Sequence, residues 1–422
     1  MAKKKVVAAK EGQLPDPFEM MKAIDDKVEI ASESVYSKIA EWIPTGSYLL
    51  NAGISGSLFG GIPSGRIITL AGPSGCGKSF VAASIVRESQ KMNYTTLYLD
   101  SEAAVDDSFL RRIGANPEKV LIRSVSTVSE VSQIVNQTLD ALQEQEDTYG
   151  KHNKFLIVID SLSNLSSIKE MNDLTEGNNK KDLTRNQDIK AFFRTISAKA
   201  GRLGVSVLCT GHTYQSLDMF KPGNIVSGGS GLAYSASVTL ELSPSKLIDK
   251  ENDEAASKAK NSADIQRTGI LVNISQKKSR FCRPIKIRII IPLYKKINQY
   301  FGLESYLGWN INEKYGICRG SMLTDKEWEK LGGDSDTVHT WEFNDKTLHC
   351  MENDKARGII VKHLGGAIDF KELFTEKVFD DEFLHTLDDL VIKPTFQLPS
   401  QDAWDDIEEV ENLIDVGEEV KE

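Results

Sequence analysis

Residues 72–79 read Gly-Pro-Ser-Gly-Cys-Gly-Lys-Ser, a complete match to the phosphate-binding loop pattern G-x-x-x-x-G-K-[ST]. The apolar run at 66–71 predicts a buried strand before it, and residues 80–86 predict a helix after it. The loop needs this context because its backbone N–H groups must curl around phosphate oxygens at the start of a helix. The chain is therefore predicted to bind a nucleoside triphosphate on an α/β fold.

Three positions at and beyond this loop supply the chemistry. Lys78 is predicted to place its ammonium group against the β- and γ-phosphates, and the Ser79 hydroxyl to reach a Mg²⁺ ion. The apolar run 155–159 ends in Asp160, which is typical of a buried strand whose terminal carboxylate holds the same ion. The residues predicted to contact the nucleotide through the loop are Gly72, Pro73, Ser74, Gly75, Cys76, Gly77, Lys78, Ser79 and Phe80.

A carboxylate after another predicted strand, at 95–100, is a candidate general base. Glu102 lies just beyond the carboxyl end of this strand, where a side chain can polarise an attacking water molecule. Spacing alone leaves Asp100 nearly as good a candidate. A solvated loop position is the third interpretation of Glu102.

The order of predicted elements divides the chain into four regions. Residues 46–295 alternate strands and helices, which predicts a mostly parallel sheet with helices on both faces. Its later strands are predicted at 205–211, 238–242, 269–275 and 284–291. The other regions are an N-terminal segment at 1–45 that carries a predicted amphipathic helix over 32–43, a small accessory domain at 296–395 and an acidic tail at 396–422.

The formal charge of −10 is concentrated at the C-terminal end. Residues 401–422 hold ten acidic side chains and one lysine, which leaves a net charge of −1 for residues 1–400. Such a terminal block is typical of a solvated segment that binds a partner or masks basic surfaces of its own chain. The five cysteines lack C-x-x-C spacing and no signal peptide or membrane-spanning run is evident, so a cytoplasmic protein is predicted.

Several motifs together resemble the RecA family of strand-exchange recombinases. These are the run Gly60–Arg66 that leads into the phosphate loop, Tyr98–Glu102 and Gly228–Ser237. The similarity is greatest to the phage UvsX-type branch, on Asp160–Leu165, His212-Thr213-Tyr214, Met219-Phe220 and Lys278-Ser279-Arg280. It covers roughly residues 47–300 and implies a RecA-like ATPase core.

The resemblance implies roles for further residues. His212 occupies the position of the family's γ-phosphate sensor, and Asp106 and Phe109 match positions that contact adenine. Residues 163–186 and 213–231 match the two DNA-binding loops. The residues in them that are expected to contact DNA are Lys169, Lys180, Lys181, Arg185, Lys221, Gly228, Gly229, Ser230 and Gly231.

Three residues are implied to act between protomers. Lys278 and Arg280 match a basic pair that reaches the γ-phosphate of the neighbouring protomer, and Tyr234 matches an aromatic residue at the protomer contact. On charge alone, Lys278 and Arg280 would be interpreted as a solvated basic face. The predicted catalytic set is thus Glu102, Lys78, His212, Lys278 and Arg280.

The family implies an ATP- and Mg²⁺-dependent recombinase. It would form a helical filament on single-stranded DNA, pair it with homologous duplex DNA in recombination, repair and replication, and work with a recombination mediator and a single-stranded-DNA-binding protein. No membrane partner is expected. Two other classes remain open: a ring-shaped helicase or translocase built on the same core, and an ATP-gated scaffold that scarcely hydrolyses ATP.

Overall fold

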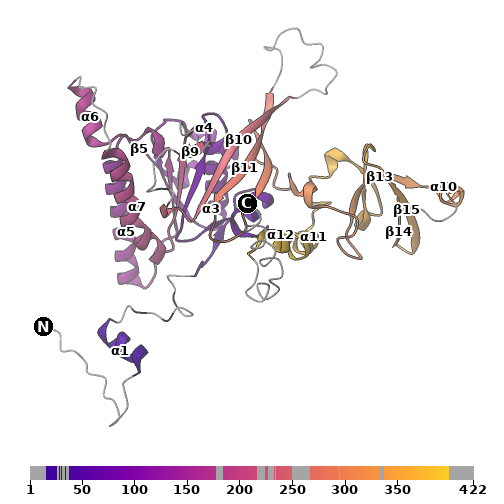
Figure 1. Cartoon of the computed structure of the whole chain (residues 1–422), viewed down its shortest axis with the longest axis horizontal. Helices are drawn as coiled ribbons and strands as arrows, with labels where there is room; N and C mark the ends of the chain where they lie inside the picture. Colours follow the sequence, from indigo (N-terminus) through magenta and orange to yellow (C-terminus); the bar gives the residue numbers. More distant parts are fainter. Residues whose placement is uncertain are drawn as a thin grey trace, which may run out of the picture.

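The chain forms a large α/β core and a smaller β-rich body beside it (Figure 1). The structure is a computed structural model. It describes residues 16–25, 28, 30, 34, 38–176, 184–215, 224–226, 232, 234–249, 267–293, 295–331 and 337–398. Within these residues no helix combines the length and apolar character needed to cross a membrane.

Eight strands form the central sheet of the core. Six are parallel, in the spatial order β10-β3-β7-β6-β4-β5, and β11 and β12 continue the sheet antiparallel beyond β10. The strands are β3 (Ile67–Ala71), β4 (Thr95–Asp100), β5 (Val120–Ser124), β6 (Phe155–Asp160), β7 (Ser206–Gly211), β10 (Val238–Asp249), β11 (Arg267–Lys278) and β12 (Lys286–Pro292). The prediction of a mostly parallel sheet is confirmed.

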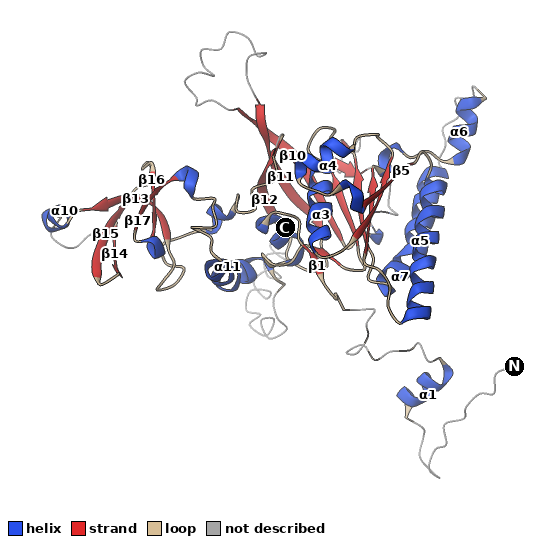
Figure 2. Ribbon diagram, turned by 180° about the vertical axis from the view of Figure 1, so that it is seen from behind, coloured by secondary structure: helices blue, strands red, loops and turns tan. Residues whose placement is uncertain are grey.

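Helices cover both faces of the sheet (Figure 2). Along β6, Leu156 and Val158 pack into one apolar cluster, and Ile157 and Ile159 pack into another, as the two-residue period of a strand requires. The first cluster includes α2 (Tyr48–Ser55), α3 (Lys78–Lys91) and α4 (Asp107–Ile113), and the second includes α5 (Val128–Tyr149) and α7 (Thr184–Arg202). Because both faces are buried, the strands read as continuous apolar runs.

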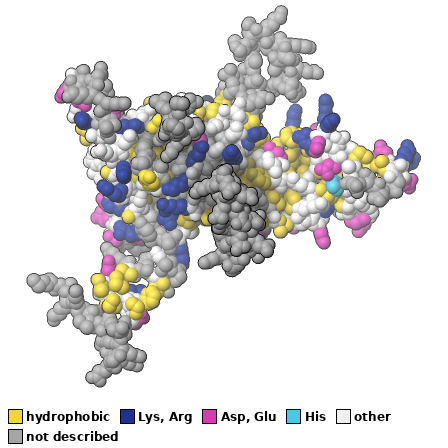
Figure 3. Space-filling view, in the orientation of Figure 1, with side chains coloured by type: hydrophobic (Ala, Val, Ile, Leu, Met, Phe, Trp, Pro, Cys, Tyr) yellow, Lys and Arg dark blue, Asp and Glu magenta, His cyan; other side chains and the backbone are white. Residues whose placement is uncertain are grey.

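The N-terminal segment differs from its prediction. The helix predicted over 32–43 is wrong at its end, because Trp42–Ile43 forms strand β1, which pairs antiparallel with β2 (Ile62–Pro63). Pro44 follows this strand and disfavours helical backbone at the residue before it. The helix that is present, α1 (Pro17–Ile24), lies apart from the core and exposes apolar side chains (Figure 3).

The accessory body is built on a five-stranded antiparallel sheet in the order β14-β15-β13-β16-β17. Its strands are β13 (Ile317–Leu323), β14 (Val338–Phe343), β15 (Lys346–Glu352), β16 (Gly358–Val361) and β17 (Gly366–Asp369), with helix α10 (Asp325–Lys330) after β13. Short 3₁₀ turns occur at Pro117–Lys119, Leu162–Asn164, Leu303–Tyr306, Lys362–Leu364 and Phe370–Glu372.

After this sheet the chain returns to the core through α11 (Asp381–Leu387), a π-helical turn at Asp388–Ile392 and α12 (Lys393–Phe396). The buried Asp388 carboxylate accepts hydrogen bonds from Ser57 Oγ at 2.7 Å and from the backbone N–H of Leu58 at 2.7 Å. The sequence placed the accessory domain at 296–395. Its strands all lie inside that range, and its last helices pack against the core.

Candidate ATP site and adjoining loops

The phosphate loop leaves β3 and enters α3, as the sequence predicts. Gly75 and Gly77 have positive φ values of 73° and 94°, which glycine adopts readily. A Cβ on Gly72 would approach the carbonyl oxygen of Leu242 to 2.5 Å, so a larger residue would displace the loop from the sheet. Lys78 starts α3 and turns back into the loop, where its Nζ donates to the Gly72 carbonyl at 3.0 Å.

Asp160 is held in place by two hydroxyl groups from the strands on either side of β6. The Tyr98 hydroxyl donates to one carboxylate oxygen at 2.6 Å, and the Thr210 hydroxyl donates to the other. Burial, followed by the proximity of Asp160, raises the pKa of Tyr98 well above its usual value, so the phenol stays a donor. An oriented carboxylate suits a hydrated Mg²⁺ ion, for which the half-buried Ser79 hydroxyl is the other predicted ligand.

The two candidates for general base have different surroundings. Asp100 is buried, and its carboxylate accepts from the backbone N–H groups of Glu102 at 2.9 Å and Val105 at 3.3 Å. The Glu102 side chain is one quarter exposed and accepts from Ser161 Oγ at 2.7 Å. Asp100 therefore shapes the loop after β4, whereas Glu102 remains open to a water molecule, and its role as the base stays a prediction.

His212 joins the predicted catalytic residues. Its Nε2 lies 3.2 Å from Glu102 Oε1, and its Nδ1 lies 3.4 Å from Lys78 Nζ. Glu102 and His212 follow the carboxyl ends of β4 and β7, and Lys78 starts the helix after the loop that leaves β3, at the same edge of the parallel sheet. The structure thus brings together Lys78, His212 and Glu102, which are separated by up to 134 residues in sequence.

Asp106 and Phe109 lie at the start of α4, close to the phosphate helix. The Asp106 carboxylate caps α4 by accepting from the backbone N–H of Phe109 at 2.7 Å, and this bond lowers the pKa of Asp106. The Phe109 ring packs edge-on against Phe80 at 6.4 Å between centroids. Asp106 and Phe109, which are predicted to contact adenine, thus lie next to Phe80, which is predicted to contact the nucleotide from the phosphate loop.

Lys278 and Arg280 lie toward the other edge of the sheet. The register places Lys278 opposite Thr239, which is level with Thr69 of β3, three residues before the phosphate loop. β11 runs away from the loop, so Arg280 is farther still. Lys278 Nζ donates to the Tyr234 carbonyl at 2.9 Å, while burial and the nearby Arg280 lower the pKa of Lys278.

The predicted DNA loops start beside the ATP site. Lys169 is exposed on α6 (Ile168–Thr175), which projects from the core (Figure 1), and Arg185 is at the start of α7. The Arg185 guanidinium donates to backbone carbonyls of its own chain, so its contact with DNA stays a prediction. The second loop contains β8 (Thr213–Gln215) and β9 (Asn224–Val226). Outside the described residues lie Lys180, Lys181, Lys221, Gly228, Gly229, Ser230 and Gly231.

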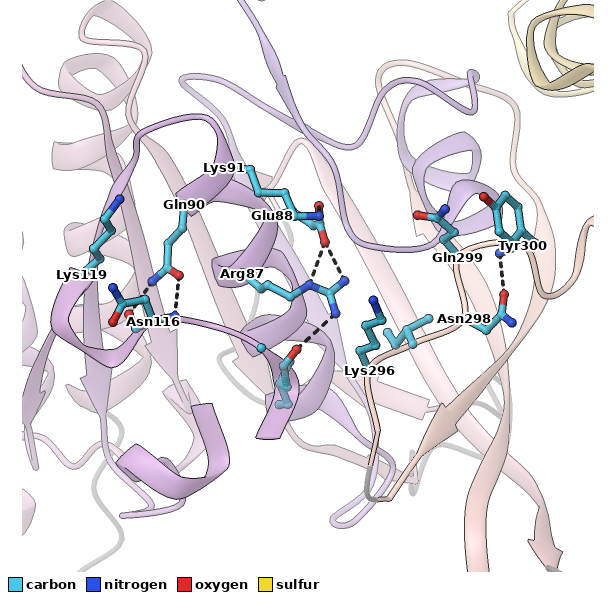
Figure 4. A pocket seen from close by; sticks show the side chains of 13 residues that line it. Arg87, Glu88, Gln90, Lys91, Asn116, Lys119, Lys296, Asn298, Gln299 and Tyr300 are labelled. Carbon is cyan, nitrogen blue, oxygen red and sulfur yellow. Dashed lines mark hydrogen bonds and ion pairs between the residues drawn. The ribbon is translucent and has the colours of Figure 1, made fainter. Parts of the chain in front are cut away.

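A cavity of about 590 Å³ lies at the far end of α3, as Figure 4 shows. Arg87 and Lys91 both pair with Glu88 at 2.6 Å in its wall, and Lys296 enters from the connector to the accessory sheet. Because α3 starts at Lys78 and rises 1.5 Å per residue, the cavity wall from Arg87 to Lys91 is about 14 to 20 Å from the phosphate loop. It is therefore separate from the nucleotide edge.

Four residues of the site were missing from the sequence prediction: Tyr98, Ser161, Ser163 and Thr210. Tyr98 and Thr210 are hydroxyl-bearing residues near the carboxyl ends of the two buried strands that flank the strand of Asp160. That pattern is a signal that could have found them. Ser163 Oγ accepts from the backbone N–H of His212, a contact across 49 residues that no local pattern indicates.

Comparison with known proteins identifies the family of this chain. The RecA N-terminal domain matches residues 26–270. The chain belongs to the RecA family. The "Recombination and repair protein" of Enterobacteria phage T4 is 28% identical over 290 residues, which cover 67% of this chain and 68% of the phage protein.

Bacterial relatives match a shorter part of the chain. Protein RecA of Treponema denticola is 27% identical over 220 residues, or 51% of this chain and 49% of that protein. Protein RecA of Cereibacter sphaeroides is 28% identical over 46% of this chain and 53% of its own length. The chain thus spans about half the length of these RecA relatives, and the resemblance inferred from the motifs is confirmed.

Proposed function

We propose that this RecA-family chain is an ATP-dependent strand-exchange recombinase that forms a filament on single-stranded DNA and pairs it with homologous duplex DNA. One observation carries the proposal: Lys78, His212 and Glu102 touch at the point where both predicted DNA loops leave the sheet. A change at the γ-phosphate therefore has a direct route to the DNA-binding segments.

In the proposed reaction ATP is the substrate and the chain's own residues position its phosphates. Lys78 binds the β- and γ-phosphate oxygens, and Glu102 takes a proton from the attacking water molecule. His212 donates to the γ-phosphate and loses that partner after hydrolysis. Ser79 and Asp160 would hold Mg²⁺, which neutralises charge on the phosphate oxygens.

The position of Lys278 and Arg280 supports a role on a neighbouring protomer. Three residues of strand and two interstrand spacings each amount to about 10 Å, which puts Lys278 out of reach of its own phosphate loop. Exposed Tyr234 lies beside Lys278, and α1 presents the exposed side chains of Phe18 and Ile24. These surfaces suit a contact between protomers in which the basic pair completes the next ATP site.

DNA contact is assigned to the two loops, which would bind chiefly the negatively charged phosphate backbone of the DNA. Lys169, Lys180, Lys181, Arg185 and Lys221 supply cations, and the glycine-rich run 228–231 supplies backbone amides. Base pairing between strands, rather than the protein, then selects the sequence. A recombination mediator and a single-stranded-DNA-binding protein complete the proposed set of partners.

The deciding experiment combines ATP hydrolysis with electron microscopy. We expect single-stranded DNA to stimulate hydrolysis and to support helical filaments in the presence of ATP and Mg²⁺. Closed rings with directional strand separation would instead identify a translocase. Filaments without turnover would identify an ATP-gated scaffold.

Mixing two inactive variants tests whether a neighbouring protomer contributes residues to the ATP site. Arg280→Ala and Lys78→Ala are each expected to be inactive alone. Co-assembled, some interfaces pair an intact phosphate loop with an intact Arg280, so part of the ATP hydrolysis should return. Co-assembly without recovery would place Lys278 and Arg280 in the site of their own protomer or in folding only.

A further inference from the structure

Residues 161–165, here called the linker turn, connect the ATP site to the first predicted DNA loop and include its first three residues. The turn follows Asp160 directly and includes the 3₁₀ segment Leu162–Asn164. On one side it contacts Glu102, the proposed base, and His212, the proposed donor to the γ-phosphate. Ser161 Oγ donates to Glu102 at 2.7 Å, and Ser163 Oγ accepts from the backbone N–H of His212 at 2.6 Å.

On its other side the linker turn is gripped by Arg185. The guanidinium donates to the carbonyl oxygens of Leu162 and Ser163, both at 2.8 Å, and to the carbonyl oxygen of Leu165. Arg185 is the second residue of α7 and lies at the end of the first predicted DNA loop, 163–186. One side chain at the end of that loop thus fixes three carbonyl groups of a turn that holds Glu102 and His212.

The geometry uses what is particular to arginine. A guanidinium is planar and offers several N–H donors in a fixed fork, whereas a lysine ammonium is a single point charge on a flexible chain. Arg185 spans acceptors that lie 20 to 23 residues away in sequence. Either lysine or arginine can supply the positive charge that a DNA phosphate needs. Hydrogen bonds to three carbonyl oxygens at once require the several N–H donors of an arginine guanidinium.

We propose that Arg185 and Ser163 are positioning residues that couple the first DNA loop to ATP hydrolysis through the linker turn. The inference rests on the proposed function and names how its ATP site is regulated. DNA bound by the loop restrains the start of α7, Arg185 fixes the linker turn, and the turn fixes Glu102 and the backbone of His212. Because binding couplings are reciprocal, nucleotide binding in turn orders the start of α7.

The first test compares Arg185→Lys with Arg185→Ala. The readout is the ratio of ATP turnover with single-stranded DNA to turnover without it. We expect Arg185→Lys to bind DNA nearly as tightly as the parent protein and to lose about tenfold in this ratio, within the usual range of coupling between sites. Arg194→Lys, an exposed position on the same helix, is the matched control and should keep the parental ratio.

The two roles of Arg185 give opposite results. If Arg185 only contacts DNA phosphates, the lysine variant keeps the parental ratio and the alanine variant loses DNA affinity. That outcome would overturn the proposal. Ser163→Ala should also lower the ratio, and Ser163→Thr, which restores a hydroxyl on the half-buried side chain, should recover it.

A second measurement needs no DNA, so it separates this inference from the proposed function. Amide hydrogen exchange at 184–190 is followed with and without a non-hydrolysable ATP analogue and Mg²⁺. The parent should exchange more slowly when nucleotide is bound, and Arg185→Lys should lose that protection. Equal protection in both proteins would overturn the coupling, even if DNA-stimulated hydrolysis is observed. Nucleotide-dependent protection in a protein that DNA fails to stimulate would support the coupling while the proposed function fails.

Discussion

The core and the accessory sheet differ in how strand direction distributes functional groups. In the core, the carboxyl ends of β3, β4, β6 and β7 meet at one edge, and Lys78, Glu102, Asp160 and His212 gather there. In the antiparallel accessory sheet, successive strands end at opposite edges, and no predicted site residue falls in it. Parallel topology concentrates chemistry at one edge, so short motifs in a parallel domain predict function well.

The largest effect should come from the core's phosphate loop. Lys78→Ala removes the ammonium group that donates to the loop carbonyls of Gly72 and Pro73, so ATP hydrolysis should fall by about 10² to 10³-fold. Lys91→Ala, on the same helix but at its far end, should leave hydrolysis unchanged. A steady-state ATPase assay of both variants makes the comparison. Equal losses would mean that the lysine acts through helix stability.

Glu102→Gln should separate binding from chemistry at the same edge. The amide still accepts from Ser161, so the loop stays in place, but it no longer takes a proton from water. We expect turnover to fall by about 10²-fold while ATP affinity and DNA binding remain. Single-turnover kinetics with an equilibrium binding measurement checks this. Turnover at the parental rate would identify another residue as the base.

The contact of Asp388 with Ser57 and Leu58, which joins the last helices to the core, should show a smaller effect when it is removed, on stability alone. Asp388→Ala leaves the Leu58 N–H and the Ser57 hydroxyl without their buried acceptor, which should lower the free energy of unfolding by about 3 kcal/mol. Asp389→Ala, the neighbouring exposed carboxylate, is the control and should leave unfolding unaltered. Urea denaturation measures both. The same urea midpoint for the two variants would show that the hydrogen bonds of Asp388 contribute little to the free energy of unfolding.

Removal of the acidic tail should have the smallest effect. Its net charge of −9 repels DNA phosphates, so deletion of residues 400–422 should strengthen DNA binding a few-fold, most for duplex DNA. The gain should shrink with salt as the screening length falls from about 10 Å at 0.1 M to about 3 Å at 1 M. DNA titrations at several salt concentrations decide this, and superimposable curves for the two proteins would rule out self-masking.

The sequence was sufficient where a residue's role depends on its neighbours in the chain. The phosphate loop, the strand that ends in Asp160 and the alternation of the core are local patterns, and the structure has each as predicted. The helix predicted over 32–43 was wrong at its end because a two-residue strand such as β1 depends on its partner β2, which is 20 residues away. Local periodicity does not encode that partner.

Contacts between distant segments account for the other gaps. Ser163 holds the backbone of His212, and Arg185 grips the linker turn, although each of these side chains reads as loop or basic surface in the sequence. Asp388 lies 331 residues from Ser57, yet the two form a hydrogen bond. Hydrogen bonds of this kind follow from tertiary packing, so a single sequence does not reveal them.

The register of β11 has a kinetic consequence. Because Lys278 lies out of reach of the phosphate loop of its own chain, the two parts of the proposed ATP site do not meet within one molecule. If these parts meet only between molecules, ATP turnover per molecule rises with protein concentration and falls on dilution. The chain would then hydrolyse little ATP as separate molecules and more when assembled on single-stranded DNA, so assembly itself would regulate hydrolysis.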